Sequence, residues 1–290
     1  MKLIVKFNLV FLVIFVIGLI IAAYVSRSLL QKNARDEVVQ NARIMMESAL
    51  ASRAYTANQI KPLLETQMKY QFLPQTVPAY GATEQFNDLR KKFPDYNYKE
   101  ATLNPTNPRD RATDWEADVV NQFRQASDRS EIVGERDSQS GPTLYMARPI
   151  QIKNEACLIC HSTVDAAPKT MIEMYGPANG FGWKLNEIIG AQIVSVPLTV
   201  PVKRADDTFR VFMISLTAVF AFIAIALNLM LMFIVIRPVS RLSEIADQVS
   251  LGKIDAPEFR SKGKDEIAVL AGSFNRMRTS LVQAMKMLEE

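Results

Sequence analysis

The sequence predicts an α+β domain with an antiparallel sheet and a long N-terminal helix, placed between two transmembrane helices and followed by a helical coiled coil. This prediction rests on three observations. The chain has two long apolar runs, the periodicity between them changes from helical to alternating, and a heptad pattern lies near the C-terminus. The 290 residues, 49% of them hydrophobic, leave room for one extramembrane domain and a small module. The net charge is only +4, and the absence of a basic stripe argues against nucleic acid as a partner.

Residues 9–25 and 211–236 are the predicted membrane helices. A helix of about 20 apolar residues crosses about 30 Å of hydrocarbon, a length that the first run meets only marginally. A cleaved signal peptide is the alternative for the first run, because Ala22 and Ala23 lie near its end. The following residues lack a convincing cleavage pattern, so an uncleaved anchor is favoured.

Basic residues outside the two runs predict their orientation. Lys2 and Lys6 precede the first run, and Arg237 and Arg241 follow the second, which places both chain ends in the cytoplasm. Basic residues on the other flanks blur this rule, so the Cys-x-x-Cys-His motif at residues 157–161 decides the side. The predicted order is residues 1–8 in the cytoplasm, 9–25 in the membrane, 26–210 in the periplasm, 211–236 in the membrane and 237–290 in the cytoplasm of a bacterial inner membrane protein.

Cys157-Leu158-Ile159-Cys160-His161 is the most specific motif of the chain, and it uses both cysteines and the single histidine. This pattern is typical of covalent c-type haem attachment, in which two thioethers hold the haem and the histidine binds its iron. A structural zinc site would need two further ligands, and a redox pair or disulfide would use the cysteines alone. Both alternatives stay open. We predict one haem c with His161 as the proximal iron ligand, in a compartment outside the cytoplasm.

The periodicity between the membrane runs predicts helices first. Residues 26–67 are expected to be helical, because Gly and Pro are absent until Pro62 and apolar residues recur at helical spacing. Those apolar positions are Val38, Ala42, Met45 and Ala49. Residues 72–108 are expected to form a loop with a short helix at 83–93, and a helix capped by Thr113 or Asp114 is expected to end at Gln125.

Strands are predicted in the second half of this region. Residues 130–135 and 143–152 form an expected hairpin with a long loop at 137–141, and residues 188–197 alternate as a further strand. The haem motif lies between the hairpin and the late strand. A small antiparallel sheet flanked by helices is compatible with a PAS-like sensor domain.

Three groups of residues carry a resemblance to a known family. They are Arg53-Ala54-Tyr55-Thr56 with Ile60-Lys61-Pro62-Leu63-Leu64 and Val77-Pro78-Ala79-Tyr80; Asn104-Pro105-Thr106-Asn107-Pro108-Arg109-Asp110 with Trp115-Glu116-Ala117-Asp118; and Ala147-Arg148-Pro149-Ile150, the haem motif and Tyr175-Gly176 with Asn179-Gly180-Phe181-Gly182-Trp183. They resemble the c-type haem domain with a PAS-like fold, long catalogued as a domain of unknown function, that occurs in bacterial sensor proteins. The resemblance covers most of residues 40–200 and implies a periplasmic haem sensor that responds to redox state or to a gas.

The motif does not indicate the sixth iron ligand. Because haem attachment is expected to consume both cysteines, a methionine sulfur is the obvious substitute, and an open site that binds NO, CO or O₂ is the alternative. The candidates are Met45, Met46, Met68, Met171, Met174 and Tyr55, of which Met45 and Met46 are preferred because their helix continues into the membrane. Arg53, Arg148 and Lys169 are candidate partners for the haem propionates.

The tail after the second membrane run has a second readable pattern. Its heptad-like apolar positions are Leu242, Ile245 and Val249, then Ile267, Leu270, Phe274, Met277, Leu281, Ala284 and Leu288. Pro238, Glu244, Gly252, Asp265-Glu266 and Phe274-Asn275 resemble the HAMP signal-relay module, which implies a homodimer built on a parallel four-helix bundle. An amphipathic helix on the lipid surface is the alternative. The chain ends soon after the last heptad, so we expect either a truncated sequence or an output on a separate partner.

These patterns together predict a membrane-anchored haem-c sensor that signals through the HAMP-like tail to a cytoplasmic partner. The alternative is a mono-haem c-type cytochrome that exchanges electrons with a membrane redox complex. No enzymatic activity is expected, because the chain has no second histidine to assist peroxidase chemistry at the haem.

Overall fold

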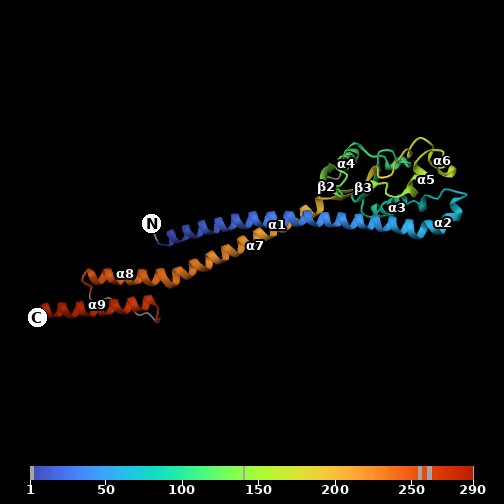
Figure 1. The fold of residues 1–290 in the computed structure, drawn as a ribbon. Coiled ribbons are helices and arrows are strands. Elements are labelled where there is room, and N and C mark those ends of the chain that lie inside the picture. The colour runs from blue at the N-terminus through green and yellow to red at the C-terminus, as the bar shows by residue number, and fades with distance from the viewer. Residues whose placement is uncertain (1–2, 140, 254–256, 260–262, 290) are drawn as a thin grey trace. The chain divides into compact units, whose positions relative to one another are not determined.

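The computed structural model describes residues 3–139, 141–253, 257–259 and 263–289 (Figure 1). It contains two compact units. One unit is residues 26–209, and the other combines residues 1–25 with residues 210–290. The candidate site lies in the first unit.

A long helix begins in the membrane run and continues into the first unit. α1 (Leu3–Tyr55) is followed by the π-helical turn η1 (Thr56–Ile60) and by α2 (Lys61–Met68), as the sequence predicts for residues 26–67. Pro62 has no N–H to donate to the carbonyl four residues earlier. The turn before it is wound more widely, with the Lys61 N–H bonded to the Thr56 carbonyl.

The rest of the first unit alternates short helices with four strands. In chain order it contains η2 (Pro74–Thr76), α3 (Pro78–Arg90), β1 (Asn97–Thr102), η3 (Pro108–Asp110), α4 (Asp114–Gln125), β2 (Ile132–Ser138), β3 (Gly141–Gln151), η4 (Glu155–Cys157), α5 (Leu158–His161), α6 (Lys169–Tyr175) and β4 (Ile188–Pro197). The strands form one antiparallel sheet in the order β1-β4-β3-β2. The predicted α+β class with an antiparallel sheet and a long N-terminal helix is therefore confirmed.

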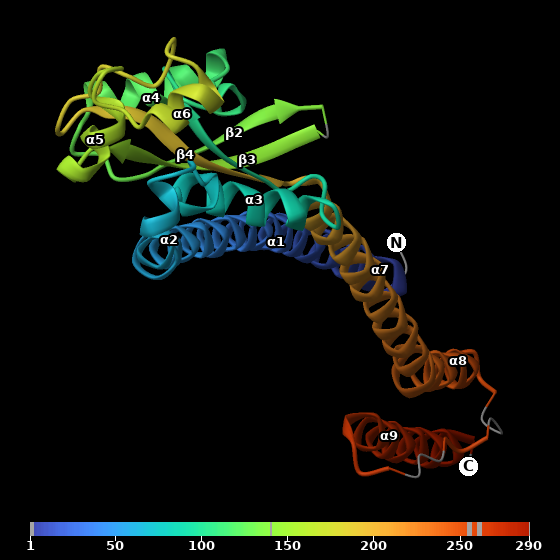
Figure 2. The ribbon, with the colours of Figure 1, turned by 90° about the vertical axis from the view of Figure 1, so that its right-hand side faces the viewer.

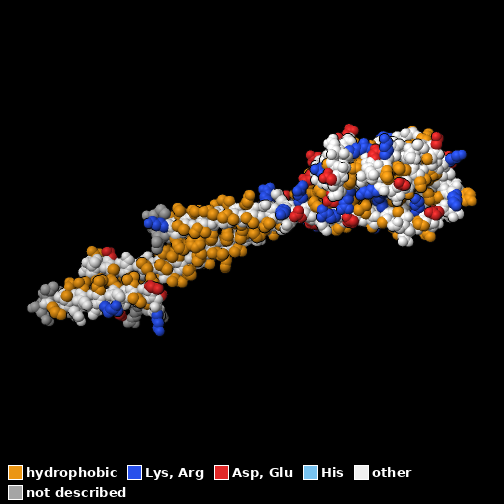
Figure 3. Space-filling view, viewed as in Figure 1, with side chains coloured by type: hydrophobic (Ala, Val, Ile, Leu, Met, Phe, Trp, Pro, Cys, Tyr) orange, Lys and Arg blue, Asp and Glu red, His pale blue; other side chains and the backbone are white. Residues whose placement is uncertain are grey.

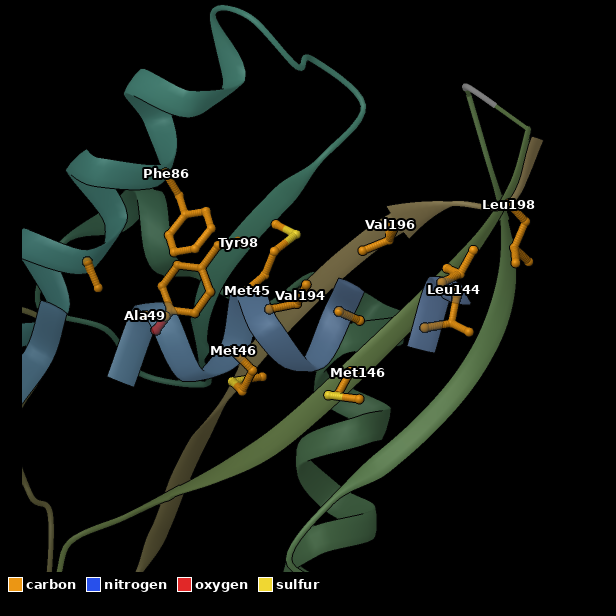
Figure 4. Close-up of a cluster of buried hydrophobic side chains, with 13 residues drawn as sticks. Met45, Met46, Ala49, Phe86, Tyr98, Leu144, Met146, Val194, Val196 and Leu198 are labelled. Atoms are coloured by element: carbon orange, nitrogen blue, oxygen red, sulfur yellow. The ribbon is translucent and has the colours of Figure 1, made fainter. Parts of the chain in front are cut away.

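Helices cover both faces of this sheet (Figure 2). On one face, α1 and α3 pack on strand residues such as Met146 and Val194 (Figure 4). On the other face, α4 packs through Val120 and Phe123 on residues such as Ile193. Because both faces are covered, every residue of the central strand β4 is buried.

Several predicted elements agree with the structure in detail. The four apolar positions predicted for the first helix, Val38, Ala42, Met45 and Ala49, all lie in the buried core. α4 begins with a capping box in which Thr113 and Glu116 satisfy each other's backbone N–H groups. The strand expected at residues 188–197 is β4.

Other elements differ from the prediction. β2 and β3 extend further toward each other than expected, so the hairpin loop is short rather than long. β1 and α6 fall in regions read as loop. β1 carries Lys99 and Glu100 in its middle, which hides its alternation, but Lys99 is paired with Glu116 and Glu100 with Arg53.

The two membrane runs form helices in the second unit. α7 (Thr199–Met230) continues through the π-helical turn η5 (Leu231–Ile236), and both α1 and α7 are long and apolar enough to cross a membrane. Figure 3 shows hydrophobic side chains over the surface of these helices. Phe15 of α1 stacks on Phe220 of α7 with ring centroids 4.9 Å apart.

The side-chain amides of Asn8 and Asn228 join α1 to α7 by two reciprocal hydrogen bonds of 2.9 and 2.8 Å. Asn228 lies well inside the predicted second span. The structure thus places Asn8, predicted to be the last residue of the cytoplasmic N-terminus, against the apolar part of α7.

After the second span, α8 (Arg237–Ser250) packs on α9 (Glu266–Glu289). Their contact is a small cluster that contains Leu242, Ile245, Val249, Phe259, Ala271 and Phe274. Four residues of the predicted heptad seam are exposed in the single chain: Leu270, Met277, Leu281 and Ala284. The predicted seam residue Leu288 has a side chain outside the described part of the structure.

We expect the Asn8–Asn228 pair to stabilise the packing of the two membrane helices. Asn8→Leu or Asn228→Leu leaves the other amide without its partner in apolar surroundings, at a cost of about 1 kcal/mol. Thermal unfolding of the full chain in detergent micelles measures this cost. In a double-mutant cycle, Asn8→Leu/Asn228→Leu should lose less than the sum of the single variants; additive losses would contradict a direct pairing.

Candidate functional site

The haem motif forms a short helical turn at the wall of a cavity. The Asn154 side chain accepts a hydrogen bond of 2.9 Å from the Ala156 N–H and so starts η4, which leads into α5. This winding turns Cys157, Cys160 and His161 toward the same cavity. Within the described residues, both cysteines are free thiols.

The cavity has a volume of about 520 Å³, which lies in the range of small-molecule and cofactor sites. Apolar side chains and a few charged groups line it together. Besides the motif, the lining includes Arg53, Lys61, Met68, Phe72, Tyr80, Glu100, Thr106, Arg109, Asp110, Ile152, Met171, Tyr175 and Trp183.

The His161 ring is held in one protonation pattern. Its Nδ1 lies 2.8 Å from the carbonyl oxygen of Gly180. Because a carbonyl can only accept a hydrogen bond, Nδ1 carries the proton and Nε2 keeps a free lone pair. Burial lowers the pKa of His161, although the hydrogen bond to Gly180 opposes this effect. The neutral ring is the form that binds a metal.

A stacked aromatic side chain also holds the face of the His161 imidazole ring. Trp183 stacks on His161 with ring centroids 3.9 Å apart and an angle of 18° between the planes. The Trp183 N–H donates a hydrogen bond of 3.2 Å to the His161 carbonyl. Side chain and backbone of Trp183 therefore hold the same residue.

A buried charged network connects α1 to β1 beside the cavity. Arg53 forms an ion pair with Glu100, which also accepts a 2.8 Å hydrogen bond from the Tyr98 hydroxyl. Burial alone would lower the pKa of Arg53, but the charge of Glu100, the nearby Tyr98 and the hydrogen bond to Glu100 together outweigh it, so the pKa is raised. Burial, followed by the charge of Glu100, raises the pKa of Tyr98. Arg53 therefore stays charged.

A second charged group lies on the 104–111 segment. Arg109 pairs with Glu84 and lies 4.8 Å from the centre of the Tyr80 ring. Burial raises the pKa of its neighbour Asp110 to about 6, although the charge of Arg109 acts in the opposite direction. The cavity wall therefore carries cationic groups that can meet carboxylates of a bound cofactor.

The structure brings some of the predicted site residues together and separates others. Arg53, Met68 and Met171 line the cavity with the haem motif. Met45 and Met46 do not reach it, because they fill the core between α1 and the sheet (Figure 4). The prediction that one of these two is the sixth ligand therefore has no support in their placement.

The other predicted residues also lie away from the cavity lining. Arg148 is held by Glu47 and Glu131 at 2.7 and 3.0 Å. Tyr55 and Met174 are exposed, and Lys169 lies in the first turn of α6.

Sequence reasoning missed residues that support the motif. Thr106, Gly180 and Trp183 all stand in segments quoted for the family resemblance, which was the only signal that pointed to them. Glu100 had no signal at all, since a lone carboxylate in a short polar stretch is typical of an exposed loop.

Comparison with known proteins identifies both parts of the chain. The Tll0287-like family model matches residues 31–197, which is more than half of the chain. The chain belongs to the Tll0287-like family. The HAMP domain model matches residues 230–283 and confirms the predicted resemblance of the tail.

A solved structure, that of the cyanobacterial haem protein Tll0287, is also similar to the chain. It is 17% identical, covers 56% of this chain and 95% of its own, and has a TM-score of 0.44. A search of curated proteins gives no match. A Tll0287-like haem domain followed by a HAMP domain indicates a haem-binding, membrane-anchored signal-transduction protein.

The residues present fit the haem that the family implies. The cavity has the volume and apolar lining of a cofactor site. His161 offers Nε2 as an iron ligand, and the thiols of Cys157 and Cys160 line the same cavity. Arg53 and Lys61 provide cations beside it.

We expect Glu100→Ala to destabilise the domain strongly, because it leaves the charge of the half-buried Arg53 without its partner. Breaking such a pair costs about 3 kcal/mol. Chemical denaturation of the full chain measures the loss. Glu135→Ala is the matched control, because Glu135 pairs with Arg35 on the exposed surface, and its loss should stay below about 1 kcal/mol. Equal losses in the two variants would show that the Arg53–Glu100 pair contributes no more to stability than an exposed ion pair.

Proposed function

We propose that the chain is a membrane-anchored sensor that carries one covalently attached haem c and relays the redox or ligand state of the haem to its HAMP domain. The arrangement of Cys157, Cys160 and His161 at one cavity wall carries this proposal. The role is in signalling rather than in catalysis of a chemical reaction.

The residues of the motif would hold the haem in two ways. Each thiol would add across one vinyl double bond of the haem, with its sulfur bonded to one carbon and its hydrogen to the other. His161 would bind the iron through Nε2, because Nδ1 donates its hydrogen bond to Gly180. The bound haem supplies one-electron redox chemistry and, where its sixth position is open, gas binding.

Two methionines are the candidates for the sixth position. Met68, at the end of α2, and the buried Met171 of α6 both line the cavity. A thioether ligand would raise the reduction potential and close the site to gases, which favours a redox signal. A site without methionine ligation would favour a gas signal.

The compartment and the assembly follow from the same proposal. Thioether attachment of haem to such a motif takes place outside the cytoplasm, so residues 26–210 face the periplasm and the HAMP domain lies in the cytoplasm of an inner membrane protein. The exposed apolar residues Leu270, Met277 and Leu281 of α9 support a homodimer, because a second copy would bury them. The output then passes to a cytoplasmic signalling partner.

We expect the full chain, produced with the periplasmic haem attachment machinery, to keep its haem after denaturation in detergent. A haem stain on a denaturing gel, together with the absorption spectrum, measures attachment. Cys157→Ala/Cys160→Ala should lose the stained band, and His161→Ala should change the spectrum.

Ile159→Ala is the matched control, because Ile159 is an exposed residue inside the motif that offers no ligand, and it should keep the wild-type stain and spectrum. Wild-type protein without covalent haem would refute the proposal. An electron-transfer cytochrome would also keep its haem in this test. If the conformation of the HAMP domain did not change with the redox state of the haem, the electron-transfer alternative would be favoured.

A further inference from the structure

We propose that Asn104 is a positioning residue that fixes the iron ligand His161 through the carbonyl of Gly180, and thereby sets the reduction potential of the haem. The inference rests on the proposed function, since it assumes that His161 binds the iron. It gives a role to the Asn104–Asp110 segment, which the proposed function leaves without one.

The side-chain amide of Asn104 forms hydrogen bonds with the backbone on both sides of the peptide group that carries the Gly180 carbonyl. Its Oδ1 accepts a 3.1 Å hydrogen bond from the Gly180 N–H, and its Nδ2 donates one of 3.1 Å to the Phe181 carbonyl. The Gly180 carbonyl lies between these two contacts in the chain. Asn104 thus determines the direction in which that carbonyl points.

The segments of Asn104 and Gly180 are in close contact, which leaves little freedom for a different orientation. Gly180 has φ +85°, and a Cβ at this position would overlap the Thr106 hydroxyl and lie 2.8 Å from the Thr106 Cα. The same hydroxyl lies 3.3 Å from Nδ1 of His161. At the far end of the contact, Arg111 donates a 2.9 Å hydrogen bond to Asn179.

The loop that Asn104 holds, residues 180–183, contacts His161 and the adjacent Ser162 at several points. The Gly180 carbonyl accepts from the ring, the Gly182 N–H donates to the Ser162 carbonyl at 2.9 Å, and Trp183 stacks on the ring. A rotation of the imidazole would have to move this loop. Because Asn104 holds Gly180 and Phe181, and Thr106 lies against both Gly180 and the ring, the orientation of the ring depends on them.

A hydrogen bond from Nδ1 to a carbonyl makes the other ring nitrogen a stronger electron donor. A stronger donor stabilises oxidised iron more than reduced iron and so lowers the reduction potential. When Asn104 is removed, the carbonyl of Gly180 is free to turn from Nδ1. The donor strength of His161 then falls, and the potential rises.

The test is redox titration of the full haem-loaded chain, with the covalent haem content measured in parallel. Asn104→Ala should keep haem attached, shift the midpoint potential to a more positive value and change the electron paramagnetic resonance spectrum of the oxidised iron. Thr113→Ala is the control for a merely structural effect, because it removes the α4 cap. It should lower stability and leave the potential unchanged.

Asn104→Ser provides the second variant, because serine keeps a turn-forming polar residue but cannot bridge both backbone groups. It should shift the potential in the same direction. Wild-type potentials in an Asn104 variant that carries haem would overturn the inference and leave the proposed function intact. A wild-type chain without haem would instead refute the proposed function.

Discussion

The packing of α1 against the sheet is the constraint on which the rest of the structure depends. Val38, Ala42, Met46 and Ala49 are completely buried in this contact. Since a close-packed interface resists small continuous shifts, this part of α1 and the sheet form one body. The same helix begins in the membrane run and ends at Tyr55, and Arg53 in its last turn lines the cavity. Any rearrangement that moves Arg53 therefore acts on a helix that reaches the membrane.

The second membrane helix begins in the same body. The central strand β4 ends at Pro197, and α7 starts at Thr199, so the strand leads directly into the second span. A π-helical turn lies beyond each long helix, η1 after α1 and η5 after α7, and each is followed by a basic residue and then a proline. Such turns interrupt an α-helix and often occur at functional positions.

An element could be predicted from the sequence where its apolar residues follow a repeating pattern, either helical spacing or strand alternation. Val38 and Ala42 recur at helical spacing and indicated the face of α1, and the alternation of residues 188–197 indicated β4. β1 could not be found this way, because Glu100 is stabilised by Arg53, a residue far away in sequence. Tertiary pairing of this kind overrides the local pattern.

The site shows the same division between local pattern and long-range contact. The haem motif is local, and its five residues were readable directly. Its support comes from Thr106 and Trp183, which lie far from it in the chain. Met45 and Met46 lie on the predicted helix, but their side chains are committed to the core (Figure 4). Helical spacing indicates which face of a helix is buried but not which buried residue reaches a cavity.

The measurement that tests the account most directly is the distance between the two α9 helices of the proposed homodimer in both haem redox states. Cys157 and Cys160 are the only cysteines of the chain, and the proposed haem attachment would consume both. A cysteine introduced by Met277→Cys therefore takes up a reduction-resistant gadolinium spin label alone. In membrane nanodiscs, the account predicts that haem reduction shifts the distance distribution between labels, and that the Cys157→Ala/Cys160→Ala background shows no shift. Identical distributions in oxidised and reduced protein would contradict signal relay and favour an anchored electron carrier.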